Sequence, residues 1–206
     1  MAEDILESLD DMARDALKEV GNIGAGNAAT AFAQFLDRKI DMTVPSVNII
    51  PLAEAQEITG DSSQPVAGVM LKVMGEAPAT ILFLLPPDSV ENLVGMVADK
   101  EVSFEELEEV DISALEEIVN ILSGSYLNAL NRMTGFNLVQ SVPECAVDMA
   151  GAILSTSLIP VGKASDYTLL INTQFIDQGE KIEGYFMLIP HADSLQKILN
   201  ELGFDL

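Results

Sequence analysis

Two pairs of side chains in this sequence have the types and spacing that suit chemistry on a partner molecule. A glutamate is followed three residues later by an asparagine at Glu19 and Asn22, and again at Glu117 and Asn120. On a helix, positions three apart lie side by side on one face. The pairs contain no nucleophile and too few ligands for a metal ion. Each pair is therefore predicted to be half of an active site that a partner completes.

Asparagine is informative at these positions because it is a mediocre helix former. A solvated helix face explains most exposed glutamates and asparagines, but it gives no reason for the same placement twice. Gly26 and Gly124 follow one turn after the asparagines, although glycine destabilises a helix interior by about 1 kcal/mol. We therefore expect a shallow floor beside each amide that suits the close approach of another protein's backbone.

The segments that carry the pairs are copies of each other. Residues 16–31 return 98 residues later as 114–129, with seven identities in sixteen positions. Val44-Pro45 precedes Val142-Pro143 by the same 98 residues. Each half predicts a helix, a strand containing Val-Pro, a hairpin that ends at a proline, and a short helix. We expect one pseudo-symmetric domain over residues 1–206, made of two repeats at about 1–98 and 103–206, with a swapped or shared sheet.

Apolar residues at helical spacing predict which side of each long helix is buried. Asp15, with Glu19 and Asn22, falls on the opposite, outward side of the first helix, and Ser113 takes the place of Asp15 on the second. This difference predicts two unequal sites. A capping-box pattern at 103–106 predicts the start of the second long helix. The inward stripes are Ile5, Leu9, Met12, Ala16, Leu17, Val20 and Ile23 on the first helix and Leu107, Ala114, Leu115, Ile118, Ile121 and Leu122 on the second.

Composition excludes several classes of partner and site. Ten basic against 33 acidic residues give a net charge of −23, which disfavours nucleic acid and anionic membranes by repulsion. The N-terminus has no signal-peptide pattern and the longest apolar run, 81–85, is too short to cross a bilayer, so a cytoplasmic location is expected. Cys145 and His191 are the only residues of their types, and structural roles are expected for both. No metal site is predicted.

One motif suggests a dinucleotide site, and its context argues against it. Gly24-Ala-Gly26-Asn-Ala-Ala29 fits G-x-G-x-x-A, but that loop must follow a buried strand. Here the preceding residues have helical period. Tight helix packing through Gly21 and Gly24 is the better explanation.

The pattern D/S-x-x-x-E-x-x-N-x-x-x-G, present twice, resembles the CheC/CheX/FliY family of phosphatases that dephosphorylate the chemotaxis response regulator CheY. The strings "LKEVGNIGAGNAATA" and "VPSVNIIP" extend the likeness, which spans almost the whole chain. The presence of the complete motif in both halves of the chain resembles the CheC-type members of the family. The resemblance implies an α+β fold, internally duplicated, in which two long pseudo-symmetric helices pack on an antiparallel sheet.

The resemblance also implies a mechanism. The Asn22 and Asn120 amides would each orient a water for in-line attack on the regulator's phosphoaspartate, as a glutamine does in small GTPases. Glu19 and Glu117 would contact the regulator's lysine. The protein would need no cofactor of its own, because the regulator carries the Mg²⁺. Asp15, Gly26, Ser113 and Gly124 would contact the partner.

A second partner and a rival function come with the same resemblance. The segment "VPECAVDMAGAIL" is similar to the region that CheC-type members use to bind the receptor deamidase CheD, which implies a role for Asp148. The rival hypothesis is a non-catalytic adaptor that binds the regulator or CheD through the same helix faces.

Overall fold

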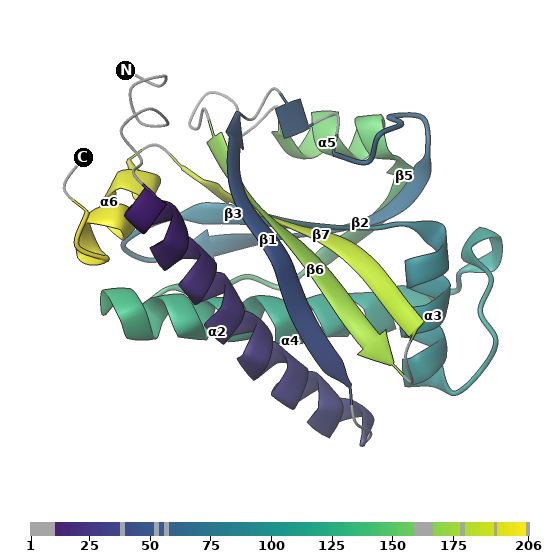
Figure 1. Cartoon of the computed structure of the whole chain (residues 1–206). Coiled ribbons are helices and arrows are strands. Elements are labelled where there is room, and N and C mark those ends of the chain that lie inside the picture. The colour runs from purple at the N-terminus through teal and green to yellow at the C-terminus, as the bar shows by residue number, and fades with distance from the viewer. Residues whose placement is uncertain are drawn as a thin grey trace.

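The fold is seen in a computed structural model, which describes residues 11–37, 40–51, 54–55, 58–158, 167–177, 180–191 and 193–204. The predicted stripe positions Ile5 and Leu9 lie outside these residues. Figure 1 shows the elements. They are α2 (Asp11–Leu36), β1 (Asp41–Pro51), β2 (Pro65–Met74), β3 (Ala79–Leu85), α3 (Pro87–Ala98), the short 3-10 helix η2 (Phe104–Glu106), α4 (Glu109–Thr134), β4 (Val139–Gln140), β5 (Glu144–Met149), α5 (Ala150–Leu158), β6 (Tyr167–Asp177), β7 (Glu180–Pro190) and α6 (Ser194–Glu201).

The strands form one antiparallel sheet of seven strands in the order β1-β6-β7-β3-β2-β4, with β5 also paired to β2. The hairpin β2–β3 and the hairpin β6–β7 meet in the middle, where β3 pairs with β7. Each hairpin then pairs with a strand from the other half of the chain, β6 with β1 and β2 with β5. The α+β class and the antiparallel sheet are as predicted, and the sheet is shared between the two halves.

Both faces of the sheet are covered. Ile81, Phe83 and Leu85 of β3 join the main apolar cluster, to which α2 and α4 also contribute. Leu82 and Leu84 point to the other face and join a smaller cluster with residues of α5. Alternate residues of β3 are thus buried on opposite sides. This explains why every residue of β3 is buried and why five consecutive residues of the strand, 81–85, are apolar. Figure 1 shows α5 on one side of the sheet and α2 and α4 on the other.

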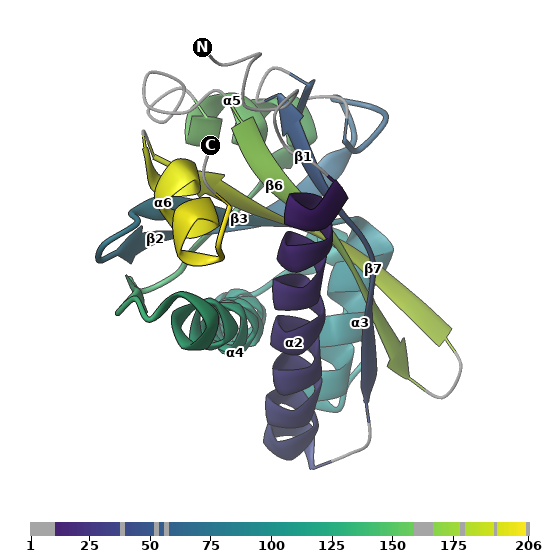
Figure 2. The same cartoon turned by 60° about the vertical axis from the view of Figure 1, so that its left-hand side comes forward.

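The long helices α2 and α4 cross each other, as Figures 1 and 2 show from two sides. At the crossing, a Cβ added to Gly24 of α2 would lie 2.4 Å from the ring of Tyr126 of α4. A Cβ added to Gly21 would lie 3.0 Å from Val47 of β1. The two glycines therefore allow α2 to approach its neighbours closely. Tight packing, and not a dinucleotide loop, is confirmed, because the whole motif lies inside α2.

The start of α4 differs from the prediction. Phe104–Glu106 forms only a 3-10 turn without a side-chain cap, and α4 begins at Glu109 with a capping box made by Glu108 and Asp111. Asp111 is buried and forms an ion pair with Lys100 at 2.9 Å. The helix starts five residues later than the pattern at Ser103–Glu106 predicts, because the Asp111 carboxylate at the third helical position both completes the capping box with Glu108 and pairs with the ammonium group of Lys100.

Two further details of the prediction are wrong. Met12 is 67% exposed, because it lies in the first turn of α2, whereas the residues of α2 in the main cluster begin at Leu17. Val142 and Pro143 lie between β4 and β5, not within a strand. Proline cannot donate to a ladder. At the matching place in β1, around Pro45, the ladder continues but its register shifts between Thr43 and Ser46.

Candidate active site

The first helix face consists of Asp15, Glu19, Asn22 and Gly26 on α2, and all four residues are exposed as predicted. The side chain of Asn22 forms no hydrogen bond with any described residue. A Cβ added to Gly26 would meet no atom within 4 Å. The floor expected beside this amide is therefore open, and no described residue restrains the amide by a hydrogen bond.

The second helix face consists of Ser113, Glu117, Asn120 and Gly124 on α4. Ser113 and Glu117 are exposed, whereas Asn120 and Gly124 are half-buried. The Asn120 Nδ2 lies 3.5 Å from Oε2 of Glu117, so the two side chains of this pair meet as their spacing predicts. Both faces thus have a carboxylate next to an amide, but their surroundings are not the same.

Gln140, which is not among the site residues predicted from the sequence, makes the difference. Its Nε2 donates to the side-chain Oδ1 of Asn120 at 2.5 Å and to the backbone oxygen of the same residue at 2.9 Å. Its side chain also lies 3.6 Å from where a Cβ on Gly124 would be. The floor beside the second amide is therefore occupied by Gln140. A comparison of the two halves could have pointed to this residue, because the polar Gln140 stands where the first half has the apolar Met42.

The neighbouring charges also differ between the faces. Lys18 on α2 is exposed, and the residue at its place on α4 is Glu116. Oε1 of Glu116 accepts a hydrogen bond from the backbone N–H of Cys145 at 3.1 Å, which ties α4 to β5. Glu116, Glu117, Asn120 and Gln140 line one open depression of about 390 Å³. The second face thus lies in a depression that carries the negative charge of the Glu116 and Glu117 carboxylates.

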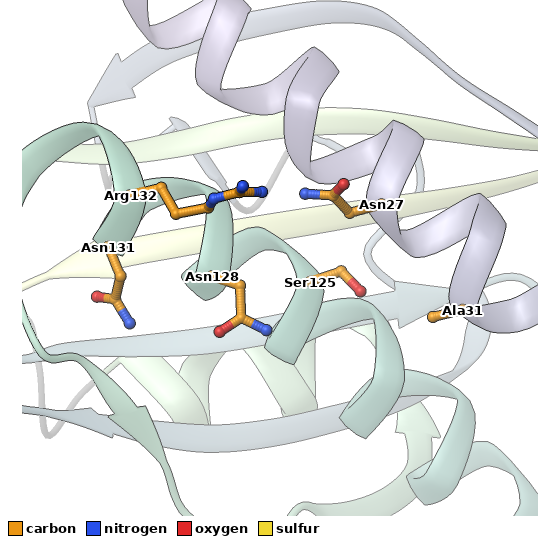
Figure 3. Close-up of a pocket in the computed structure, with 6 residues that line it drawn as sticks. All are labelled: Asn27, Ala31, Ser125, Asn128, Asn131 and Arg132. Carbon is orange, nitrogen blue, oxygen red and sulfur yellow. The ribbon is translucent and has the colours of Figure 1, made fainter.

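A polar pocket of about 530 Å³ lies where α2 and α4 run beside each other. Figure 3 shows the Asn27 side chain of α2 and the Arg132 side chain of α4 pointing toward one another across it. Asn131 is committed to the chain that follows α4, because it accepts from the backbone N–H of Leu138 and donates to its carbonyl oxygen. Ser125 donates to the carbonyl oxygen of Ile121. Arg132 is the one basic residue of α4, and α2 has Gln34 at the corresponding position.

The lone cysteine and histidine lie away from both helix faces. Burial, with Glu116 nearby, raises the pKa of the Cys145 thiol to about 11, so it is not a thiolate nucleophile at neutral pH. The His191 Nε2 lies 3.3 Å from the Thr80 hydroxyl, beside the central strands. Within the described ranges, no group of three or more His, Cys, Asp or Glu side chains could hold a metal ion. Nor, in that part of the chain, is any helix long and apolar enough to span a bilayer.

Asp148 lies on β5, outside both helix faces. It is exposed, as are its neighbours Val147 and Met149, and its Oδ1 accepts from the backbone N–H of Met149 at 2.7 Å. In the part of the chain that the structure describes, β5 pairs only with β2. Asp148 is therefore displayed on an accessible strand.

Comparison with known proteins shows the family to which this chain belongs. The model of the CheC-like family matches residues 12–49 and 111–145, which include both helix faces. The CheY-P phosphatase CheC of Bacillus subtilis (strain 168) is 36% identical over 197 residues, which cover 93% of this chain and 94% of that protein. The chain belongs to the CheC-like family.

Solved structures share the fold of the family. Thermotoga maritima FliY has a TM-score of 0.77 at 24% identity, over 95% of this chain and 98% of that one. A Borrelia burgdorferi chain, from the CheX-CheY-BeF3-Mg²⁺ complex, has a TM-score of 0.51 at 13% identity, over 82% and 95% of the two chains. These likenesses establish the CheC-like arrangement of helices and a curled antiparallel sheet.

Proposed function

We propose that this chain is a chemotaxis phosphatase that hydrolyses the phosphoaspartate of a CheY-type response regulator. The observation that carries the proposal is that two 26-residue helices each present a glutamate and an asparagine at the same spacing on an accessible face. Its relative in Bacillus subtilis is named for this activity, and a structural neighbour was solved with CheY, BeF3 and Mg²⁺. Membership of the same family favours the same substrate class.

In the proposed reaction, a water oxygen bonds to phosphorus while the bond between phosphorus and the aspartate oxygen breaks. The products are inorganic phosphate and the regulator's free carboxylate, and no covalent intermediate forms on this chain. Oδ1 of Asn22 or Asn120 accepts a hydrogen bond from the attacking water and aligns it. Glu19 or Glu117 pairs with the regulator's lysine once docking excludes water. The regulator carries the Mg²⁺, so the phosphatase needs no cofactor of its own.

We also propose that the chain is one domain made of two repeats, at about residues 1–98 and 103–206. The two stretches matched by the family model begin at residues 12 and 111, close to the 98-residue register of the sequence. In each half, a long helix comes before an edge strand and a central hairpin. The shared sheet then makes the halves one domain, with one working site on each long helix.

We further propose that Asp148 on β5 contributes to binding of the receptor deamidase CheD. The support is its exposure on a strand that also displays Val147 and Met149, together with the sequence likeness of this segment. A cytoplasmic location is proposed as well, as expected of an enzyme that acts on an intracellular signalling protein.

The experiment follows decay of ³²P-labelled phospho-CheY with the phosphatase at one-twentieth or less of the substrate concentration. Accelerated decay of all the substrate indicates turnover, because an adaptor present at so low a ratio can affect only the fraction it binds. The Asn22→Ala, Asn120→Ala double variant should bind phospho-CheY with a Kd within about threefold of wild type but lose the acceleration. Decay at the uncatalysed rate with wild type, despite binding, would favour the adaptor.

A further inference from the structure

We propose that Gln140 is a positioning residue for the second site and that no residue in the described part of the chain plays this role at the first site. The inference rests on the proposed function, because it concerns how that site aligns its water. Gln140 lies on β4, outside the helices, and donates through one nitrogen to both oxygens of Asn120. It is the described residue that fixes the amide of Asn120 from the side of the sheet.

The hydrogen bond to Oδ1 determines which way the amide faces. An asparagine amide that rotates by half a turn exchanges its acceptor and its donor. Alignment of water for attack requires the acceptor, so a rotated amide presents the wrong atom. Gln140 favours one orientation because its Nε2 can pair with Oδ1 but not with Nδ2. On the other side, Nδ2 faces the Glu117 carboxylate at 3.5 Å, which favours the same orientation.

The contact positions Asn120 without masking it. A carbonyl oxygen has two lone pairs, and Gln140 uses one of those on Oδ1, which leaves one for a water. Asn120 stays half-buried, and it lines the depression together with Glu117 and Gln140. The depression therefore leaves the amide accessible to a partner.

Gln140 makes this contact through its amide nitrogen, while its amide oxygen has no hydrogen-bond partner among the described residues. This oxygen, Oε1, is buried. Buried polar atoms without partners are uncommon, and each one needs a reason. A glutamine that served only the packing of β4 could be replaced by an apolar residue, as in the first half, where Met42 stands at this position and is buried in the main cluster.

The test is phosphatase kinetics of Gln140→Met in the Asn22→Ala background, in which only the second site is intact. Methionine keeps the length of the side chain and removes the donor. Without this donor the Asn120 side chain is no longer held in one orientation, and the cost of ordering one side chain predicts a kcat about three- to tenfold lower. KM should stay within about twofold of the Asn22→Ala value. Gln140→Glu, which also lacks the donor, should give a similar loss. The matched control is Gln174→Met, because Gln174 donates from a different strand to Glu183 and touches neither helix face.

Two further measurements separate positioning from a general effect on the fold. Gln140→Met should add no loss to the Asn120→Ala variant, because the residue it positions is gone. Nitrogen-15 relaxation of the Asn120 side-chain amide should show faster motion in Gln140→Met than in wild type, a readout that needs no activity. Unchanged or higher kcat, or unchanged amide motion, would overturn the inference. Lack of phosphatase activity in the Asn22→Ala variant itself would instead count against the second site of the proposed function.

Discussion

The two helix faces have the same pair of side chains but hold them differently. On α2, the Asn22 amide is exposed and the space over Gly26 is open. On α4, Asn120 is held between Gln140 and Glu117, and Gln140 also covers Gly124. On the second face, the asparagine side chain is therefore held in place by Gln140, which lies on β4 and not on the helix. Equal motifs do not give equal sites when a neighbouring strand determines how free the side chains are.

Two glycines of α2 allow a comparison within one helix, and they should give the largest change in stability. Gly24→Ala would place a Cβ 2.4 Å from the Tyr126 ring, so the helices must move apart, and we expect unfolding free energy to fall by about 1–3 kcal/mol. Gly26→Ala meets nothing within 4 Å and should raise it by about 0.5–1 kcal/mol. Urea unfolding of both variants measures the contrast. Equal effects would mean that α2 and α4 do not cross at Gly24.

The start of α4 should contribute stability that depends on pH. The side-chain bond to Lys100 is the main reason why the pKa of Asp111 is lowered from its ordinary value, so Asp111→Asn should lower the unfolding free energy at pH 7 by about 1 kcal/mol. A lowered carboxyl pKa means that the stabilisation is complete above the unfolded pKa of about 4 and disappears as pH falls through the folded value. Urea unfolding near pH 7 and near pH 3 should show the difference between variant and wild type shrinking in acid.

The control for this prediction is Glu105→Gln in η2, because Glu105 is exposed. Its unfolding free energy should match wild type at both pH values. A difference between Asp111→Asn and wild type that stayed constant with pH would show that the Lys100 ion pair does not stabilise the helix start. The first half has Ala13 at the matching position, so no such dependence is expected from the start of α2.

The charge difference between Asp15 and Ser113 should give the smallest effect. Both residues are exposed, and exposed ion pairs contribute roughly 0.2–1 kcal/mol. With a lysine on the regulator as partner, Asp15→Ser should raise KM of the first site about two- to threefold, and Ser113→Asp should lower KM of the second site by a similar factor. The measurements use the Asn120→Ala and Asn22→Ala backgrounds, respectively. Effects on kcat, or effects that persist in about 0.5 M salt, would contradict this explanation.

The two long helices and most of their exposed residues could be predicted from the sequence, because both depend on local periodicity. The helical spacing of Leu17 and Val20, or of Leu115 and Ile118, indicates the buried side of each helix. The residues opposite are exposed as predicted, except Asn120 and Gly124, which are half-buried. The start of α4 was placed wrongly, since two capping patterns follow one another and the ion pair of Asp111 with Lys100 selects the second.

The contact between Gln140 and Asn120 could not be predicted in the same way. It joins a two-residue strand to a helix, and it depends on how β4 pairs with Val73 and Met74 of β2. The pairing of β1 with β6 likewise brings together residues far apart in the sequence. Such contacts depend on the whole fold, and the sequence contains no local periodicity that encodes them.

We propose that each long helix has its own working amide and that the amide on α4 is the better ordered of the two. The direct test is decay of ³²P-labelled phospho-CheY with Asn22→Ala, with Asn120→Ala and with the double variant. We expect each single variant still to accelerate decay, Asn22→Ala to retain the higher kcat, and the double variant to lose roughly 10²-fold or more of the acceleration. Complete loss in either single variant, or full activity in the double variant, would contradict it.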